Sequence, residues 1–239
     1  MAEYKLYYFY VRGKGQVIRY VLEDNDVSFE DIVVPLWSEE IKQRCLSNQG
    51  LYSEDFANFK PDWQSKEWQE LKPKTTFGQL PYLTGPNGLE IAECYAILRY
   101  FGRKLNLYGN NDIEAAKIDM LLERENQTIT EIFKSLFVKQ DNSARIESTK
   151  ICDTLVIFQK LLEKNNKGEG YFVGDKVSIA DYAMLDLLDA CISLSSTMLD
   201  AYPTLKAFYN RMASREKIAA CKATEKYKSF YIAGNLGLK

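Results

Sequence analysis

The stretch that decides the fold is the opening segment YKLYYFYVRGKGQVIRY, residues 4–20. Its first part, KLYYFYV at 5–11, is aromatic and β-prone and ends at Arg12-Gly13, which predicts a buried strand. The sequence QVIRYVLE at 16–23 follows with apolar residues at helical spacing and predicts a helix. A second strand is predicted for SFEDIVV at 28–34, so the chain begins strand–helix–strand.

Farther along, two short apolar runs flank the turn sequence GPNG at 85–88, which predicts a β-hairpin. The sequence CYAILRYFGRK at 94–104 is amphipathic and predicts a helix, and the polar stretch at 106–112 is the expected domain boundary. Residues at about 35–63 are irregular and polar, with large aromatic side chains scattered among them. We interpret them as an ordered insertion into the first domain, because so many aromatic groups do not suit a solvated linker.

After the boundary the pattern becomes helical, and no strand signal follows about residue 112. The sequence SIAD at 178–181 predicts a capping box, with Ser as the cap and Asp returning to the backbone. The helix that follows, residues 181–194, is apolar nearly all round and should be central and buried. The residues alone therefore predict a small α/β unit followed by a helical bundle.

Composition excludes several chemistries. The 239 residues include no histidine, which rules out Ser-His-Asp triads, Cys-His nucleophile pairs and His-rich zinc sites. The net charge of −2 is spread over interspersed acidic and basic residues, so neither a nucleic acid nor a membrane surface is an expected partner. Acid–base chemistry must then come from carboxylates, lysine, cysteine, a bound cofactor or one of the 16 tyrosines.

Cysteine use favours a reducing compartment. The chain opens with MAEYKLYYFY, which lacks the charged and leucine-rich regions of a secretory signal. The five cysteines are scattered, with no CxxC pair that would suggest a disulfide framework or a metal site. We therefore expect a cytoplasmic protein with no metal.

Four segments, in order along the chain, resemble the cytosolic glutathione transferases, most closely the sigma class and also the mu and pi classes. They are YKLYYFYVRGKGQVIRY at 4–20, FGQLPYL at 77–83, IAECYAILRYFGRKLNLYG at 91–109 and GDKVSIADYAMLDLL at 174–188. Each motif is weak or moderate alone, but four in register cover nearly the whole chain outside the insertion.

The resemblance implies an α+β, thioredoxin-like, glutathione-binding domain at 1–105, with the insertion at about 35–63. It implies an all-α domain at 113–239, which contributes the pocket for the electrophile. Glutathione would be a co-substrate, with no other cofactor, and the protein would be a homodimer.

Tyr8 matches the family's catalytic tyrosine, whose hydroxyl hydrogen-bonds the glutathione sulfur and favours the thiolate. The alternative is that Tyr8 is one more aromatic residue packed on a buried strand, which is the interpretation we favour for Tyr7 and Tyr10. By the same resemblance, Phe9 and Lys14 line the electrophile pocket.

The glutathione site implied by the resemblance draws on four further segments. Trp68 and Lys72 would hold the glycyl carboxylate, and Gln79 stands where sigma members often carry lysine. A cis bond between Leu80 and Pro81 would present the Leu80 backbone to the cysteinyl part of the peptide.

The pair Glu93-Cys94 would hold the γ-glutamyl end, where mu, pi and sigma members usually have Gln-Ser. A thiol is a weaker donor than a hydroxyl, so we expect Cys94 to weaken glutathione binding without abolishing it. Gln127 aligns with an aspartate that the partner subunit lends to the same site, which would remove one charge contact.

The predicted function is conjugation of glutathione to small hydrophobic electrophiles, as in detoxification. Two alternatives stay open. One is a glutathione-dependent isomerase or peroxidase of the sigma-class type, and the other is a non-catalytic protein that binds glutathione or another ligand.

Overall fold

The computed structural model describes residues 2–35, 65–137 and 142–229. The insertion expected at about 35–63 lies almost wholly outside these residues. The chain forms two compact units, Met1–Ile97 with Cys221–Lys239, and Leu98–Ala220. The domain bounds predicted from the linker, 1–105 and 113–239, differ from these units. The boundary between the units falls within the helix at 94–104, and the C-terminal residues from 221 onward belong to the first unit.

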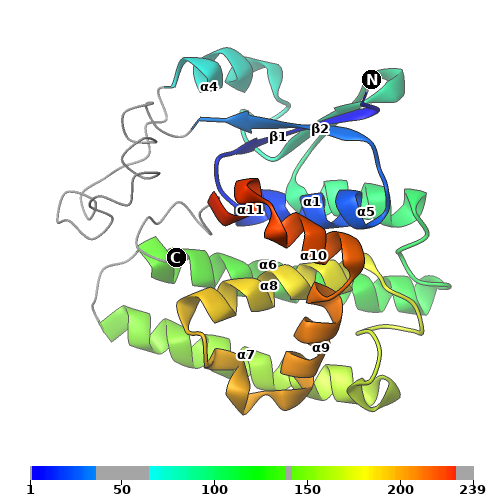
Figure 1. Ribbon diagram of the computed structural model, residues 1–239, viewed down its shortest axis with the longest axis vertical. Coiled ribbons are helices and arrows are strands. Elements are labelled where there is room, and N and C mark those ends of the chain that lie inside the picture. Colours follow the sequence, from blue (N-terminus) through cyan, green and yellow to red (C-terminus); the bar gives the residue numbers. More distant parts are fainter. Residues whose placement is uncertain (1, 36–64, 138–141, 230–239) are drawn as a thin grey trace. The chain divides into compact units, whose positions relative to one another are not determined.

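A four-stranded sheet forms the first unit's framework (Figure 1). Its strands are β1 (Tyr4–Phe9), β2 (Phe29–Val34), β3 (Tyr82–Gly85) and β4 (Leu89–Ala92), in the order β2-β1-β3-β4. Strands β1 and β2 are parallel, whereas β3 runs antiparallel to both β1 and β4. The predicted strand–helix–strand opening and the hairpin are both confirmed.

Both helices predicted for this part of the chain are confirmed: the first spans 13–24 where 16–23 was predicted, and the second spans 94–104 as predicted. Ser65 caps α4, because its hydroxyl accepts a hydrogen bond from the Trp68 N–H at 3.3 Å. The elements are α1 (Gly13–Asp24), α4 (Lys66–Leu71), η1 (Lys72–Lys74), η2 (Pro86–Gly88), the start of α5 (Cys94–Lys104), the end of α10 (Glu216–Ala223) and α11 (Glu225–Ser229).

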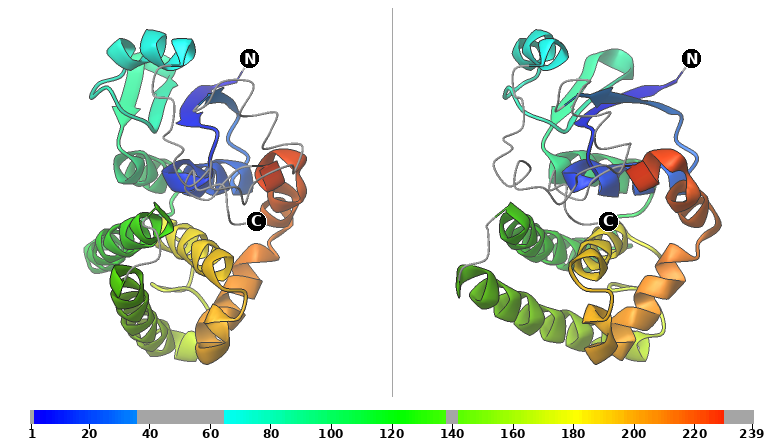
Figure 2. Two further views of the ribbon diagram at one scale, coloured as in Figure 1. Left: turned by 90° about the vertical axis from the view of Figure 1, so that its left-hand side faces the viewer. Right: turned by 60° about the vertical axis from the view of Figure 1, so that its left-hand side comes forward.

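The second unit is helical, and no strand occurs between residues 98 and 220 apart from the undescribed residues 138–141. Its centre is α8 (Ile179–Leu194), which is buried from Ile179 to Cys191 and packs on both α6 and α9 (Figure 2). The predicted central helix is therefore confirmed. Around it lie α6 (Asp112–Phe137), α7 (Asn142–Lys164), η3 (Asn166–Gly168), η4 (Met198–Ala201) and α9 (Pro203–Ala213).

The predicted capping box at the start of α8 is also present. The Asp181 carboxylate accepts hydrogen bonds at 2.8 Å from the backbone N–H groups of Ser178 and Phe172, and another from the Ser178 hydroxyl. Burial nevertheless raises the pKa of Asp181 to about 6, against these hydrogen bonds, which lower it. One carboxylate thus fixes both the helix start and the preceding loop.

Candidate active site

Strand register brings three of the predicted segments to one edge of the sheet. Tyr7 on β1 pairs with Tyr82 on β3, and Tyr82 pairs with Ala92 on β4. The end of β1, the start of β3 and the end of β4 therefore lie at the same edge. Tyr8 belongs to the first of these, and the Leu80-Pro81 and Glu93-Cys94 pairs stand next to the other two.

The Tyr8 side chain is held firmly at this edge. Only 8% of its surface is exposed, and its hydroxyl oxygen accepts a hydrogen bond from the Lys14 backbone N–H at 2.9 Å. Lys14 lies in the first turn of α1, where the N–H groups have no partner within the helix. A hydroxyl can accept and donate at once, so this contact fixes the oxygen without using the donor capacity of the hydroxyl.

Two glycines make room for the Tyr8 ring. A Cβ atom on Gly13 would lie 2.6 Å from the Tyr8 hydroxyl oxygen, and one on Gly15 would lie 2.4 Å from its Cδ1 atom. Gly13 also has a φ of +36°, outside the conformations that other residues prefer. The sequence analysis gave these glycines no role, although the spacing Gly-x-Gly next to the tyrosine was a visible signal.

The Cys94 thiol is directed into the protein. It is 2% exposed, and its Sγ atom donates a hydrogen bond to the Lys14 carbonyl oxygen at 3.1 Å. The two peptide groups of Lys14 thus contact two of the predicted site residues, Tyr8 through N–H and Cys94 through C=O. The structure adds an internal partner for the thiol that the sequence did not reveal.

Glu93, directly before α5, is exposed and adopts a φ of +70°. A residue other than glycine in this conformation carries strain, which tends to occur at ligand-binding positions. Helices α1 and α5 both begin at this edge, and the positive end of a helix dipole favours a negatively charged group. The edge is suited to binding an anionic peptide.

Aromatic packing joins two further predicted residues. The rings of Phe9 and Trp68 meet edge to face, with centroids 5.3 Å apart, and Trp68 is only 5% exposed. Lys72, which follows α4, is exposed, and its aliphatic chain lies along Gly78. Phe9 was assigned to the electrophile pocket and Trp68 to the glutathione site, so their contact places the two predicted subsites side by side.

The remaining predicted residues lie around this core. The Leu80–Pro81 peptide bond is cis as expected, with Pro81 buried and Gln79 exposed. The Lys14 ammonium lies 5.8 Å from the centre of the Tyr95 ring, a cation–π contact.

A buried ion pair lies next to the Tyr8 ring, and the sequence analysis did not predict it. Arg19 donates to the Asp31 carboxylate at 2.9 Å and to the Val11 carbonyl oxygen at 3.2 Å. Its guanidinium also lies 5.8 Å from the centre of the Tyr8 ring. The available signal was an arginine among the apolar residues of α1 and an aspartate on the neighbouring strand.

Comparison with known proteins agrees with this geometry. Residues 126–225 match the family described as the glutathione S-transferase C-terminal domain. The chain is 32% identical over 220 residues to glutathione S-transferase P 10 of Caenorhabditis elegans, covering 92% of this chain and 90% of that protein. The chain belongs to the glutathione S-transferase family. It is accordingly a glutathione transferase, with an N-terminal α/β domain and a helical C-terminal domain.

Solved structures extend the family assignment. The pi-class glutathione S-transferase of Onchocerca volvulus matches this transferase with a TM-score of 0.81 and 28% identity, over 99% of this chain and all of that one. Prostaglandin synthase D of Nilaparvata lugens matches with a TM-score of 0.69 and 25% identity, over 94% and 98% of the two chains. The pi class is thus represented among the relatives, and the sigma class is not singled out.

No cluster of three or more His, Cys, Asp or Glu side chains that could hold a metal ion occurs in the described residues. None of the helices in these parts of the chain is long and apolar enough to cross a membrane.

Proposed function

We propose that this transferase activates glutathione through Tyr8. The hydrogen bond from the Lys14 N–H to the Tyr8 oxygen carries the proposal, because it orients the hydroxyl so that its proton can point to a bound sulfur. A free thiol has a pKa near ~8.5, and only its thiolate attacks electrophiles well. A hydrogen bond donated to the thiolate lowers that pKa and increases the reactive fraction at neutral pH.

In the proposed reaction the sulfur lone pair attacks an electrophilic carbon, and a C–S bond forms. With an aryl halide the halide leaves with its bonding electrons, and the thiol proton has already passed to solvent. The Tyr8 hydroxyl stays protonated throughout and stabilises the sulfur's charge. Small hydrophobic electrophiles are the proposed second substrates, with Phe9 and Lys14 as part of their site.

The other predicted residues are proposed to bind the tripeptide. Glu93 is exposed in its strained conformation and can pair with the γ-glutamyl ammonium. Lys72 is exposed and can pair with the glycyl carboxylate, while the buried Trp68 is proposed to form the floor of the site. The backbone of Leu80, beside the cis bond, is proposed to pair with the cysteinyl part. Gln79 and Cys94 complete the proposed set.

A homodimer in the cytoplasm with a role in detoxification is the proposed setting, on the basis of family membership. The motif resemblance favours the sigma class, and the pi-class names of relatives favour a pi-like enzyme. We propose conjugation as the main activity. Isomerase activity is the second candidate, supported by the likeness to a protein named prostaglandin synthase D.

The test combines retention on immobilised glutathione with conjugation of an activated aryl chloride, measured as a function of pH. Tyr8→Phe should stay bound to the resin but lose about one to two decades in rate at neutral pH, from a charge-directed hydrogen bond worth roughly 1.5–3 kcal/mol. Tyr7→Phe and Tyr10→Phe are the matched controls and should stay active. A fully active Tyr8→Phe enzyme would contradict the assignment. A wild-type protein that binds glutathione but conjugates nothing would favour the non-catalytic alternative.

A further inference from the structure

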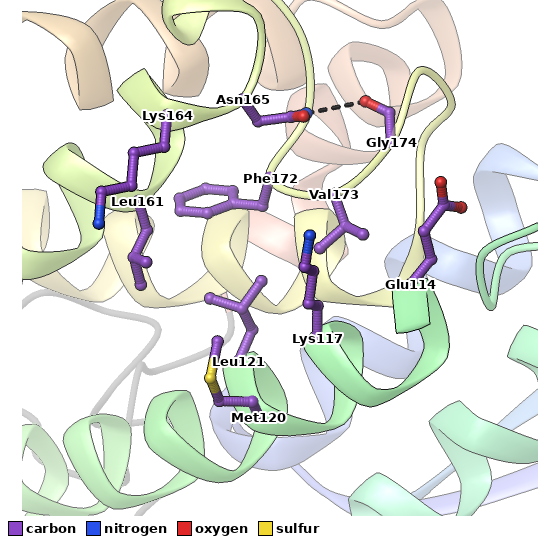
Figure 3. Close-up of a pocket in the computed structure, with 10 residues that line it drawn as sticks. All are labelled: Glu114, Lys117, Met120, Leu121, Leu161, Lys164, Asn165, Phe172, Val173 and Gly174. Carbon is purple, nitrogen blue, oxygen red and sulfur yellow. Dashed lines mark hydrogen bonds between the residues drawn. The ribbon is translucent and has the colours of Figure 1, made fainter. Parts of the chain in front are cut away.

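The second unit contains a cavity that none of the proposed catalytic or glutathione-binding residues lines. Its volume is about 290 Å³, near the lower end of the roughly 300–1,000 Å³ typical of small-molecule sites. Its walls come from α6, the end of α7 and the loop before α8 (Figure 3). The lining residues are Glu114, Lys117, Met120, Leu121, Leu161, Lys164, Asn165, Phe172, Val173 and Gly174.

The floor of the cavity is apolar and rigid. Leu121, Phe172 and Val173 are all buried, and the Phe172 ring packs edge to face against Phe208 at 5.0 Å between centroids. The Asn165 side chain donates hydrogen bonds of 2.8 Å to the carbonyl oxygens of Tyr171 and Gly174, which fix the loop at both ends. A ligand would therefore enter a preformed site, with little ordering cost.

The rim carries two lysines. Lys117 lies on α6 and Lys164 in the last turn of α7, and Figure 3 shows them on either side of the Phe172 ring. Among the parts of the chain that the structure describes, neither ammonium has an ion-pair partner. Two positive charges beside an apolar floor suit a molecule with an apolar body and one negative group.

A single carboxylate makes one end of the cavity more negative than the other. Glu114 accepts a hydrogen bond from the Asn110 N–H at 2.7 Å and lies beside Gly174, where an added Cβ atom would be 3.2 Å from its oxygens. Its charge repels an anion at this end of the cavity. The negative group of a ligand should therefore bind on the side of the Phe172 ring that carries Lys164, away from Glu114, with its apolar body over Phe172 and Leu121.

We propose that this cavity binds a small amphiphilic monocarboxylate, as a second ligand that is distinct from the two substrates of conjugation. The volume suits a chain of about ten carbons better than a larger lipid. The site and its ligand class follow from the lining residues alone, so they do not depend on the role proposed for Tyr8.

The experiment is calorimetric titration of the full-length protein with decanoate and, as the uncharged comparison, decanol. Both titrations are made with the glutathione site saturated by S-hexylglutathione, so that binding near Tyr8 does not contribute. Decanoate should bind saturably with one site per chain, more tightly than decanol, and its affinity should fall as salt is added.

Charge variants test the rim. Lys164→Gln should weaken decanoate binding by about two- to fivefold, as expected for a partly exposed charge pair, and Lys117→Gln should weaken it less, while both leave decanol binding unchanged. Glu114→Gln should tighten decanoate binding by about twofold. Lys160→Gln, one turn earlier on α7 and outside the cavity lining, is the matched control and should have no effect.

Leu161→Trp places an indole in the cavity and should abolish the binding of both ligands. If this variant does not fold, the lysine variants still test whether decanoate binds in the cavity. Absence of saturable decanoate binding would overturn the proposal. Decanoate binding that all the charge variants leave unchanged would overturn it too. Failure of S-hexylglutathione to bind would instead contradict the glutathione site, and the lysine variants would then decide whether decanoate binds in the cavity.

Discussion

The Cys94 thiol donates a hydrogen bond to the backbone carbonyl of Lys14, the residue whose N–H holds the Tyr8 hydroxyl. The first turn of α1 is thereby fixed from the start of α5. A cysteine in this position has a structural role besides any contact with glutathione. The consequence is that changes at Cys94 should affect the sulfur-activating group indirectly.

Cys94→Ala should therefore raise the pKa of bound glutathione's thiol and lower the conjugation rate. It removes a hydrogen bond worth about 0.5–1.5 kcal/mol, and the Lys14 peptide is then held less firmly. Cys94→Ser should keep the rate within about twofold of wild type and the pKa within about 0.3 unit, since its hydroxyl can donate to the same carbonyl. Ultraviolet titration of the bound thiolate, together with initial rates, provides the measurement. Equal behaviour of the alanine and serine variants would contradict a role for the Lys14 contact.

Gly15→Ala is expected to reduce both stability and activity. Replacing glycine by alanine within a helix normally stabilises it by roughly 0.5–1 kcal/mol. Here the new methyl group would lie 2.4 Å from Cδ1 of Tyr8, so the ring or the helix must move, at a cost of about 1–3 kcal/mol. The steric term is the larger one, so the net effect should be destabilising.

Urea unfolding and initial rates test this prediction, with Gly170→Ala as the control. At Gly170 the nearest atom to an added Cβ is Asn166 Nδ2, at 3.8 Å, so no clash arises. The control should stay within about 0.5 kcal/mol of wild type, as most surface changes do. A Gly15→Ala protein more stable than wild type would show that Tyr8 is not confined as the structure indicates.

Sequence patterns predicted the local elements of this fold well, for physical reasons visible in particular residues. The strand at β1, the hairpin around GPNG and the capping box at Ser178-Asp181 each depend on side chains close together in the chain. The candidate site was identified through motif resemblance, and register then placed its segments at one edge of the sheet.

Contacts between distant residues could not be predicted in this way. Periodicity shows which face of a helix is buried but not which element covers it. The hydrogen bond between Arg12 and Tyr227, 215 residues apart, therefore could not be predicted from the sequence. The Cys94–Lys14 contact joins residues 80 apart and depends on the rotamer of a single thiol. The cavity beside Phe172 likewise results from three segments whose mutual packing the sequence does not state.

Tyr227→Phe should loosen the first turn of α1. The Tyr227 hydroxyl accepts a hydrogen bond from Arg12 at 3.0 Å and another from Tyr20 at 3.1 Å, and the Arg12 guanidinium lies 5.1 Å from the centre of its ring. The variant keeps the ring but loses both hydrogen bonds, at a cost of about 1–3 kcal/mol. Hydrogen exchange should then become faster at the Lys14 amide, which lies two residues from Arg12.

Lys228→Gln on the same helix is the control, because the Lys228 side chain forms an exposed ion pair with Glu225. It should leave stability and exchange within error of wild type. Unchanged exchange at Lys14 in Tyr227→Phe would mean that α11 does not support the Tyr8 site.

Asp181 should make the stability of the protein depend on pH. Burial raises its pKa in the folded state to about 6, above the value near ~4 expected in the unfolded chain. Between these two values the folded state binds more protons, so the free energy of unfolding falls as pH rises. A shift of this size corresponds to roughly 3 kcal/mol, present in full below about pH 4 and lost once pH exceeds about 6.

Asp181→Asn removes this titration and serves as the reference. Its amide accepts through one oxygen only and turns an N–H toward backbone donors, whereas the protonated acid of folded wild type at pH 4 keeps two oxygens that can accept. The variant should therefore be the less stable protein at pH 4. Wild type loses the Asp181 contribution to its stability between pH 4 and pH 7, and the variant has no such contribution to lose. The difference between their free energies of unfolding should therefore narrow as pH rises. Denaturant unfolding at pH 4, 5, 6 and 7 measures it, with Asp175→Asn, an exposed aspartate of the same loop, as the control. Parallel pH curves for wild type and Asp181→Asn would show that the Asp181 carboxylate keeps its ordinary pKa, because the Phe172 and Ser178 hydrogen bonds then cancel the effect of burial.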